Sequence, residues 1–235
     1  MKVLIIIPAY NEEDNIEATV GKLKAKCPDY DYVVINDCSK DNTAKILDEN
    51  NFNHIDLCSN LGIGGAVQTG YMYALDKGYD IAVQMDGDGQ HNCEYISEII
   101  KPIIEGNADI VIGSRFISNE GFLSTGMRRA GIKFLSSWIK VYCGVKIHDV
   151  TSGFRAANKK FIEFYSKNYA IDYPEPEAIV SAAVLGGKIA EVPVVMNERT
   201  GGKSSISALK SVYYMSKVSI AILFAKIIYK GGFKK

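Results

Sequence analysis

The stretch Met85–His91, MDGDGQH, comes directly after a short apolar run that has the pattern of a strand. Side chains at i and i+2 of an extended segment point to the same side, so Asp86 and Asp88 present two carboxylates together. Gln90 and His91 lie just beyond them and extend this into a compact set of ligands. Mg²⁺ or Mn²⁺ suits such a set and usually keeps positions for phosphate oxygens. The structural alternative is an Asp-Gly turn that caps the next helix.

Expected strands and helices alternate on both sides of this stretch. The strands are expected at Val3–Ile7, Tyr32–Ile35, His54–Leu57, Asp80–Gln84 and Asp109–Ile112. Between them, helices are expected at Glu12–Lys26, Ala44–Glu49, Val67–Lys77 and Glu94–Ile104. The continuous β-branched run of the first strand is typical of a strand buried on both faces of a parallel sheet. The order predicts an α/β protein with a doubly wound, mostly parallel sheet in one continuous domain.

Two further features lie at the carboxyl ends of expected strands, where open α/β sheets bind ligands. Asp37 follows the second strand, although it could also serve as a turn or helix-capping residue. The glycine-rich turn Asn60–Ala66 enters a helix, and such turns let backbone amides approach phosphate or sugar closely. Tight packing between strand and helix explains its glycines nearly as well.

Composition limits the classes of partner and compartment. The 235 residues are 47% hydrophobic, ample for a full core, and 27 basic residues balance 27 acidic ones, so nothing suggests nucleic acid binding. Five cysteines, an odd number without a CxxC pair, indicate reduced thiols and a cytosolic protein. We expect no signal peptide, because Pro8 interrupts the first apolar run. We expect no spanning helix either, because the longest uncharged run of the tail, Val218–Ala225, is too short.

The C-terminal end is strongly basic. After Glu198 the chain has no acidic residue but eight bases: Arg199, Lys203, Lys210, Lys217, Lys226, Lys230, Lys234 and Lys235. We expect residues 206–235 to form a basic, amphipathic helical segment, as one helix or two shorter ones, that contacts a membrane surface. Packing in a homo-oligomer and a simply solvated basic end are the alternatives.

Taken together, the motifs resemble those of family 2 glycosyltransferases with the GT-A fold, and specifically the dolichol-phosphate or polyprenyl-phosphate sugar synthases. They lie in the family order: IIIPAYNEEDNI (Ile5–Ile16), VINDCSKDNTA (Val34–Ala44), NLGIGGAVQTG (Asn60–Gly70), MDGDGQH, IGSRF (Ile112–Phe116), DVTSGFRA (Asp149–Ala156), EVPV (Glu191–Val194) and RTGGKSS (Arg199–Ser205). The resemblance implies a GT-A domain over residues 1–205, with a nucleotide-binding half and an acceptor half, followed by the segment 206–235.

The resemblance also implies a role for each matching residue. The nucleotide pocket would be Pro8, Ala9, Tyr10, Glu12, Asp37, Gly65 and Asp86. Mg²⁺ or Mn²⁺ would bind Asp86, Asp88 and Gln90, bridge the diphosphate and act as a Lewis acid for the departing nucleoside diphosphate. The acceptor phosphate would be held by Arg115, Arg128, Arg129 and Ser204. The catalytic set would be Asp88, Arg115, Asp149 and Arg199, the last of which closes over the donor phosphates.

Some of these residues have structural alternatives. Arg128 and Arg129 could be solvated residues ahead of the apolar helix expected at Ile132–Val141. Asp149 could orient the site, help to deprotonate an acceptor, or serve a purely structural role linked to Arg155.

The segment Tyr169–Ala178, YAIDYPEPEA, is expected as a rigid acidic loop that feeds a short helix, Ile179–Leu185. Its PEPE sequence replaces the glycine-rich entry usual in the lipid-phosphate sugar synthases, so the identity of the sugar stays open.

The charge changes of the reaction favour a phosphate acceptor. Breaking a sugar–diphosphate bond builds negative charge on the leaving group, which metal and arginine stabilise. A lipid phosphate is an ionised nucleophile that needs no strong general base, whereas a sugar hydroxyl needs one. No unambiguous base stands out, because His91 lies within the metal motif and His54 and His148 are lone histidines.

We therefore expect an enzyme that moves a sugar from a UDP- or GDP-linked donor to undecaprenyl or dolichyl phosphate, with inversion as the resemblance implies. It would be peripheral on the cytoplasmic face of the membrane, and any multi-pass partner would be a separate protein. Transfer to a saccharide acceptor is the enzymatic alternative and would need a base near Asp149 or Glu175. A non-catalytic nucleotide-sugar-binding subunit of a membrane complex is the alternative of another class.

Overall fold

The computed structural model describes residues 1–117, 126–197 and 217–224. Its sheet contains the strands β1 (Val3–Ala9), β2 (Asp31–Asn36), β3 (His54–Asp56), β4 (Ile81–Gln84), β5 (Ile110–Ser114), β6 (Arg155–Asn158) and β7 (Ile189–Pro193). Their spatial order is β3-β2-β1-β4-β6-β5-β7. All neighbouring pairs are parallel except those of β6, which runs antiparallel to both β4 and β5. The predicted mostly parallel α/β fold is confirmed.

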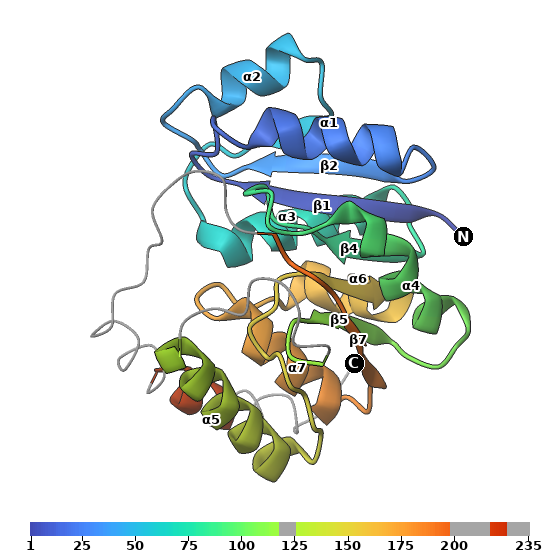
Figure 1. The fold of residues 1–235 in the computed structure, drawn as a ribbon, viewed down its shortest axis with the longest axis vertical. Helices are drawn as coiled ribbons and strands as arrows, with labels where there is room; N and C mark the ends of the chain where they lie inside the picture. Colours follow the sequence, from blue (N-terminus) through green and yellow to red (C-terminus); the bar gives the residue numbers. More distant parts are fainter. Residues whose placement is uncertain (118–125, 198–216, 225–235) are drawn as a thin grey trace.

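The helices cover both faces of this sheet (Figure 1). They are α1 (Ile16–Lys26), α2 (Thr43–Glu49), α3 (Gly62–Asp76), α4 (Ile96–Ile104), α5 (Gly126–Cys143), α6 (Lys159–Lys167) and α7 (Pro174–Val184), with a 3-10 turn, η1 (Cys93–Tyr95), before α4. Residues 217–224 are also helical. No helix in these described ranges is both long and apolar enough to cross a membrane.

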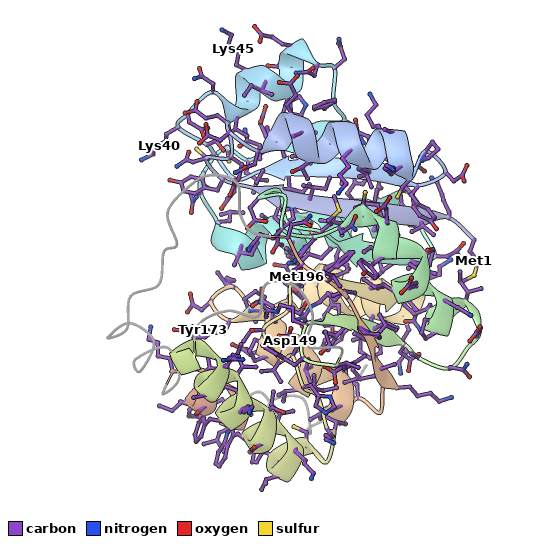
Figure 2. All side chains as sticks on the ribbon, in the orientation of Figure 1. Met1, Lys40, Lys45, Asp149, Tyr173 and Met196 are labelled. Atoms are coloured by element: carbon purple, nitrogen blue, oxygen red, sulfur yellow. The ribbon has the colours of Figure 1, made fainter. Side chains whose placement is uncertain are left out.

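The central strand β1 is buried along its whole length. Because side chains alternate along a strand, Leu4 and Ile6 enter one hydrophobic cluster, on the side of α3, α5, α6 and α7. Val3, Ile5 and Ile7 enter the other, on the side of α1 and α4. Side chains fill both layers between sheet and helices (Figure 2). The uninterrupted apolar run of β1 is therefore explained by burial on both faces.

Two sequence-based expectations about elements are wrong, and three elements, β6, α6 and β7, have no counterpart among the expected ones. The glycine-rich stretch does not precede α3 but forms its first turns, because the helix begins at Gly62. The segment expected as an acidic loop becomes helical at Pro174, since proline fits the first helical position and Glu175 and Glu177 favour the helix N-terminus. Strand β6 was not predicted, because its sequence RAAN has no apolar run.

Gly70 on α3 shows how closely the helices pack on the sheet. A Cβ at this position would collide with the buried side chain of Ile6 in β1. Gly21 on α1 has open space around the same position.

These two glycines give a matched test of the packing. We expect Gly70→Ala to lower the free energy of unfolding by about 1–3 kcal/mol, because the added methyl group overpacks the contact with β1. Gly21→Ala should raise it by about 0.5–1 kcal/mol, since alanine loses less backbone entropy in a helix. Urea denaturation of both variants measures the difference, and a neutral Gly70→Ala would contradict this packing.

Candidate active site

Three strand ends meet at one edge of the sheet, as the sequence predicted. Pro8 and Ala9 end β1, Asp37 follows β2, and Asp86 follows β4. The Asp37 amide donates to the Ala9 carbonyl at 2.8 Å, and the Gly87 amide donates to the Pro8 carbonyl at 3.3 Å. The end of β1 thus lies between the predicted base-binding aspartate and the predicted metal motif.

Asp37 is buried and connects β2 to the start of α3. Its Oδ1 accepts a hydrogen bond from the Leu61 amide at 2.6 Å, and its carbonyl accepts one from the Asn60 side chain at 3.1 Å. Gly65 is buried, and a Cβ there would collide with the Cβ of Leu61, the residue just before α3. Packing within the first turn of this helix therefore accounts for the glycine, rather than the expected packing of strand against helix. The nucleotide-binding roles of Asp37 and Gly65 stay predictions.

The turn after β1 combines an exposed aromatic ring with a fixed backbone. Tyr10 is 42% exposed, so its ring is accessible from solvent. The Glu12 amide donates to the Thr43 hydroxyl at 2.9 Å, and the Glu12 carboxylate accepts from the Asn15 side chain at 2.8 Å. The turn is therefore held against the start of α2 while Tyr10 projects from it.

The metal motif has two carboxylates in a tight loop after β4. The Asp86 side chain is 35% exposed, and its Oδ1 accepts a hydrogen bond from Gln84 Nε2 at 3.2 Å. Asp88 Oδ1 accepts from the Gln90 amide at 3.0 Å. The loop also binds the segment that follows β7, since the Asn197 amide donates to the Gln90 carbonyl at 2.9 Å.

His91 does not belong to the ligand set in which the sequence placed it. Its ring is buried and stacks on Phe154 at a centroid distance of 4.9 Å. Its Nδ1 accepts a hydrogen bond from the Asp86 amide at 3.0 Å, which requires the ring proton to be on Nε2. His91 therefore fixes the backbone of the loop at Asp86 while its ring packs in the core.

The donor set fits a hard divalent cation that takes further ligands from a substrate. The described part of the chain contains no cluster of three His, Cys, Asp or Glu residues able to hold a metal by itself. Asp86, Asp88 and Gln90 carry side-chain oxygens and lie within one short loop after β4. Mg²⁺ and Mn²⁺ bind through one or two carboxylates and complete their shell with phosphate oxygens and water.

Behind Asp86 lies a polar contact that sequence reasoning missed. Gln84 is buried in β4, and its Oε1 accepts a hydrogen bond from the Tyr169 hydroxyl at 3.5 Å while its Nε2 donates to Asp86. Burial raises the pKa of Tyr169 well above its usual range, so the hydroxyl keeps the proton that it donates. A Cβ on Gly153 would lie 2.9 Å from Asp86 Oδ2, so any larger residue there would displace the Asp86 carboxylate.

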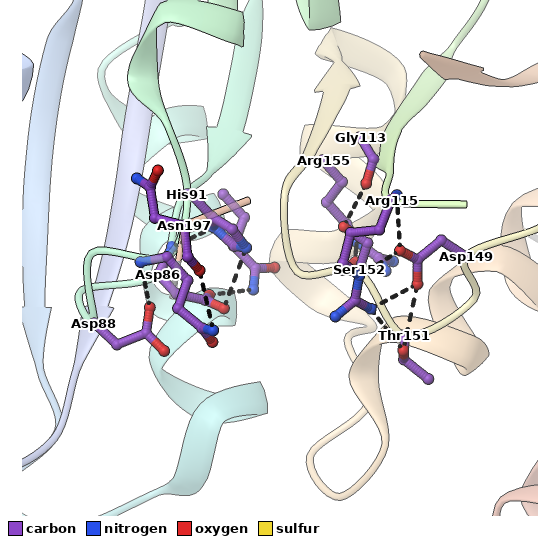
Figure 3. Close-up of polar contacts among 12 residues, drawn as sticks. Asp86, Asp88, His91, Gly113, Arg115, Asp149, Thr151, Ser152, Arg155 and Asn197 are labelled. Carbon is purple, nitrogen blue, oxygen red and sulfur yellow. Dashed lines mark hydrogen bonds and ion pairs between the residues drawn. The ribbon is translucent and has the colours of Figure 1, made fainter. Parts of the chain in front are cut away.

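The half of the site predicted to hold the acceptor is built around a buried ion pair (Figure 3). Arg115 Nε and Nη2 donate to the two carboxylate oxygens of Asp149 at 2.7 and 2.8 Å, and Nη2 also donates to the Thr151 hydroxyl at 3.2 Å. The alternative that linked Asp149 to Arg155 is wrong in its partner. Arg155 instead donates to the carbonyls of Ser152 and Glu175.

Glu191 holds the segment that carries Asp149. Its carboxylate accepts hydrogen bonds from the amides of His148 and Asp149 and from His148 Nδ1, all at 2.8–2.9 Å. The EVPV motif of β7 thus anchors the loop whose aspartate orients Arg115. This geometry supports a structural role for Asp149, and the roles of Asp149 in proton transfer and of Arg115 at the acceptor phosphate stay predictions.

Several predicted site residues are not placed here. Arg199 and Ser204 lie outside the described residues, as does the side chain of Arg128. Arg129 is exposed on α5.

The Arg115–Asp149 pair gives a stability prediction. We expect Asp149→Ala to lower the free energy of unfolding by about 3–5 kcal/mol, because it leaves the guanidinium of Arg115 buried without its partner. Glu49→Ala, which breaks an exposed pair with Lys45 at 3.7 Å, should cost no more than about 0.5 kcal/mol. Chemical denaturation compares the two, and equal losses would show that the buried pair does not hold this half together.

Comparison with known proteins provides independent evidence about the family of this chain. The model of "Glycosyl transferase family 2" matches residues 4–165. The polyprenol monophosphomannose synthase of Mycolicibacterium smegmatis is 31% identical over 231 residues, which cover 93% of this chain and 86% of that protein. The undecaprenyl-phosphate mannosyltransferase of Micrococcus luteus is 30% identical over 219 residues, covering 88% of each chain.

Among solved structures, a similar fold occurs in glucosyl-3-phosphoglycerate synthase from Mycobacterium tuberculosis, determined in complex with Mn²⁺, UDP and glucosyl-3-phosphoglycerate. The TM-score is 0.70 at 19% sequence identity, over 96% of this chain and 79% of that one, so this likeness concerns the GT-A fold alone. The family match spans the strands and loops that carry Asp37, Asp86, Asp88, Arg115 and Asp149. The chain belongs to glycosyl transferase family 2.

Proposed function

We propose that this protein transfers a sugar from a nucleotide-sugar donor, UDP- or GDP-linked, to a polyprenyl phosphate, with Mg²⁺ or Mn²⁺ as cofactor. The observation that carries the proposal is the pair Asp86 and Asp88 at the end of β4, beside the end of β1 and Asp37. Two relatives at 30% identity or more are named for transfer to polyprenol or undecaprenyl phosphate.

In the donor half, Pro8, Ala9, Tyr10, Glu12 and Asp37 would hold the base and ribose, and Gly65 would line the pocket from α3. Asp86, Asp88 and Gln90 would hold the metal. The metal, when bound, neutralises charge on the diphosphate as the bond to the sugar breaks. Arg199 would add a second positive charge that stabilises the leaving group.

In the acceptor half, the phosphate would meet a positively charged surface. Arg128, Arg129 and Ser204 are proposed as direct contacts, and Arg115, oriented by Asp149, as the buried positive charge behind them. An ionised phosphate oxygen needs no base to attack the sugar carbon, so a site rich in arginine suits this acceptor better than a hydroxyl. The protein would work as a peripheral protein on the cytoplasmic face of a membrane, in contact through residues 206–235.

A transfer assay tests the proposal. Purified protein is incubated with Mn²⁺ or Mg²⁺ and a panel of nucleotide sugars, with undecaprenyl phosphate, with a saccharide, or with neither. We expect release of one nucleoside diphosphate that depends on both the lipid and the metal. Release that follows the saccharide instead would favour the other enzymatic candidate, and absence of any transfer would favour a binding subunit.

Asp88→Ala should abolish this transfer, because the change removes one of two proposed carboxylate ligands. The fold should survive, since Asp88 lies in a loop outside both hydrophobic clusters. Glu94→Ala, at an exposed acid of the following turn, serves as the control and should keep full activity. A fully active Asp88→Ala protein would rule out the carboxylate pair as the metal site.

Gln84 gives a separate prediction about the metal. Gln84→Leu should weaken Mn²⁺ binding roughly 10–100-fold, because Asp86 loses the hydrogen bond that orients its carboxylate. Gln68→Leu, which removes an α3 amide that donates to the Ser166 carbonyl rather than to Asp86 or Asp88, should leave the Mn²⁺ affinity unchanged. Titration of Mn²⁺ followed by electron paramagnetic resonance, in the presence of nucleoside diphosphate, measures both affinities without turnover. Equal affinities in the two variants would show that Gln84 does not orient Asp86.

A further inference from the structure

The outer surface formed by α5 and residues 217–224 has an unusual composition. Four large apolar side chains are more than half exposed there: Phe134 (52%), Val141 (81%), Ile220 (53%) and Phe224 (59%). From Gly121 through His148 the sequence contains no acidic residue but five basic ones, and residues 217–224 contain no acid either. We call the four apolar side chains, together with Lys133 and Lys140, the basic apolar face.

The two helices form one unit. The Tyr142 hydroxyl on α5 donates to the Leu223 carbonyl at 3.1 Å. Val218 and Ile222 are buried in the same hydrophobic cluster as Ile132 and Ile139 of α5. Figure 1 shows α5 and the short red helix together at one extremity of the molecule.

The exposed residues share an orientation on each helix. At 100° per residue, Lys133, Lys140, Phe134 and Val141 fall within one arc of α5, with the lysines on one margin and the apolar residues on the other. Ile220 and Phe224, four positions apart, lie on the side opposite buried Val218 and Ile222. Exposed apolar side chains flanked by lysines without acids are the pattern of a helix that lies in a membrane interface.

The face also borders the acceptor half of the site. The Ser136 hydroxyl on α5 donates to the carbonyl of Ile147, two residues before Asp149. Helix α5 packs against α7, which follows the segment in which the Tyr169 hydroxyl donates to Gln84, the residue that donates in turn to Asp86. A lipid phosphate drawn from a bilayer beneath this face would therefore enter from the acceptor side.

A second copy of the chain suits this face less well than a lipid surface does. A symmetric dimer would place the same lysines opposite one another, without any acid on either helix to pair with them. Anionic phospholipids supply the opposite charge, and the apolar side chains enter the acyl boundary.

We infer that the basic apolar face docks the protein on a membrane surface containing anionic phospholipids. This inference rests on the proposed function only in the choice of a lipid surface, and it names α5, not the basic C-terminal segment alone, as a contact. The face would hold the acceptor half of the site toward the bilayer.

The test is flotation of the full-length protein with vesicles of phosphatidylcholine, with or without phosphatidylglycerol. We expect binding to the anionic vesicles only, weakening as salt screens the lysines. The double variant Phe134→Asp with Ile220→Asp should bind at least about tenfold more weakly, and Lys133→Glu with Lys140→Glu likewise. Ile104→Asp, at an equally exposed apolar residue on α4 (53%), is the matched control and should bind normally.

Three results would overturn the inference. They are unchanged binding by both double variants, absence of binding by the wild-type protein, and a dimer, seen by sedimentation velocity without lipid, that the apolar double variant dissociates. Thermal unfolding of each variant, compared with the wild type, excludes misfolding as the cause of lost binding.

A transfer assay with a short-chain polyprenyl phosphate in detergent separates the two proposals. Because the docking variants leave the donor and acceptor residues intact, they should keep this activity while losing vesicle binding. If the vesicles are bound as expected but neither the wild type nor any variant transfers sugar, the proposed function is wrong and the docking inference is still supported.

Discussion

Burial of β1 on both faces is the constraint on which the rest of this structure depends. A strand that carries apolar side chains on both sides is stable only between two layers of helices, and here it pairs with β2 and β4 in parallel. Parallel pairing brings the carboxyl ends of these strands to one edge. The groups at these ends are Pro8 and Ala9 of β1, Asp37 after β2 and the Asp86–Asp88 loop after β4, so they are neighbours as a consequence of core packing.

The second half of the site is stabilised differently. There the chain relies on buried polar contacts: Asp149 with Arg115, Glu191 with the His148 and Asp149 amides, and Arg155 with two carbonyls. Such contacts are costly to break and specify one arrangement, because a buried charge left unpaired has no water to compensate it. The two halves meet where Gly153 lies against Asp86, so the polar network of one half limits the position of the carboxylate in the other.

The sequence allowed the alternating core and the donor edge of the site to be predicted, because both depend on local patterns. Val3–Ile7 is recognisable by its apolar run, and Asp86 and Asp88 by their spacing after a strand. Strand β6 could not be predicted, because Arg155 and Asn158 are not typical strand residues. This segment is a strand because it pairs with β4 on one side and with β5 on the other.

Contacts between side chains far apart along the chain could not be predicted from the sequence either. Nothing near Asp149 indicates that Arg115 is its partner, and nothing in MDGDGQH shows that His91 turns to stack on Phe154. The one signal available for Gln84 was a polar residue in an otherwise apolar strand. The start of α7 has a signal in the sequence, a proline followed by acidic residues, but prolines and acidic residues are also typical of a loop.

The pairing of β1 has a consequence for how the protein folds. Val3 is matched with Ile81, so the pairing of β1 with β4 joins two segments that are far apart in the sequence, with β2, β3 and α3 between them. Non-local parallel pairing of this kind slows folding, because the entropy of a long loop is lost before the contact is gained. The Asp86–Asp88 loop reaches Pro8 through that same pairing, so a chain in which β1 and β4 are unpaired lacks the complete edge proposed to hold the nucleotide. Ligand binding would then act as a direct report of completed folding.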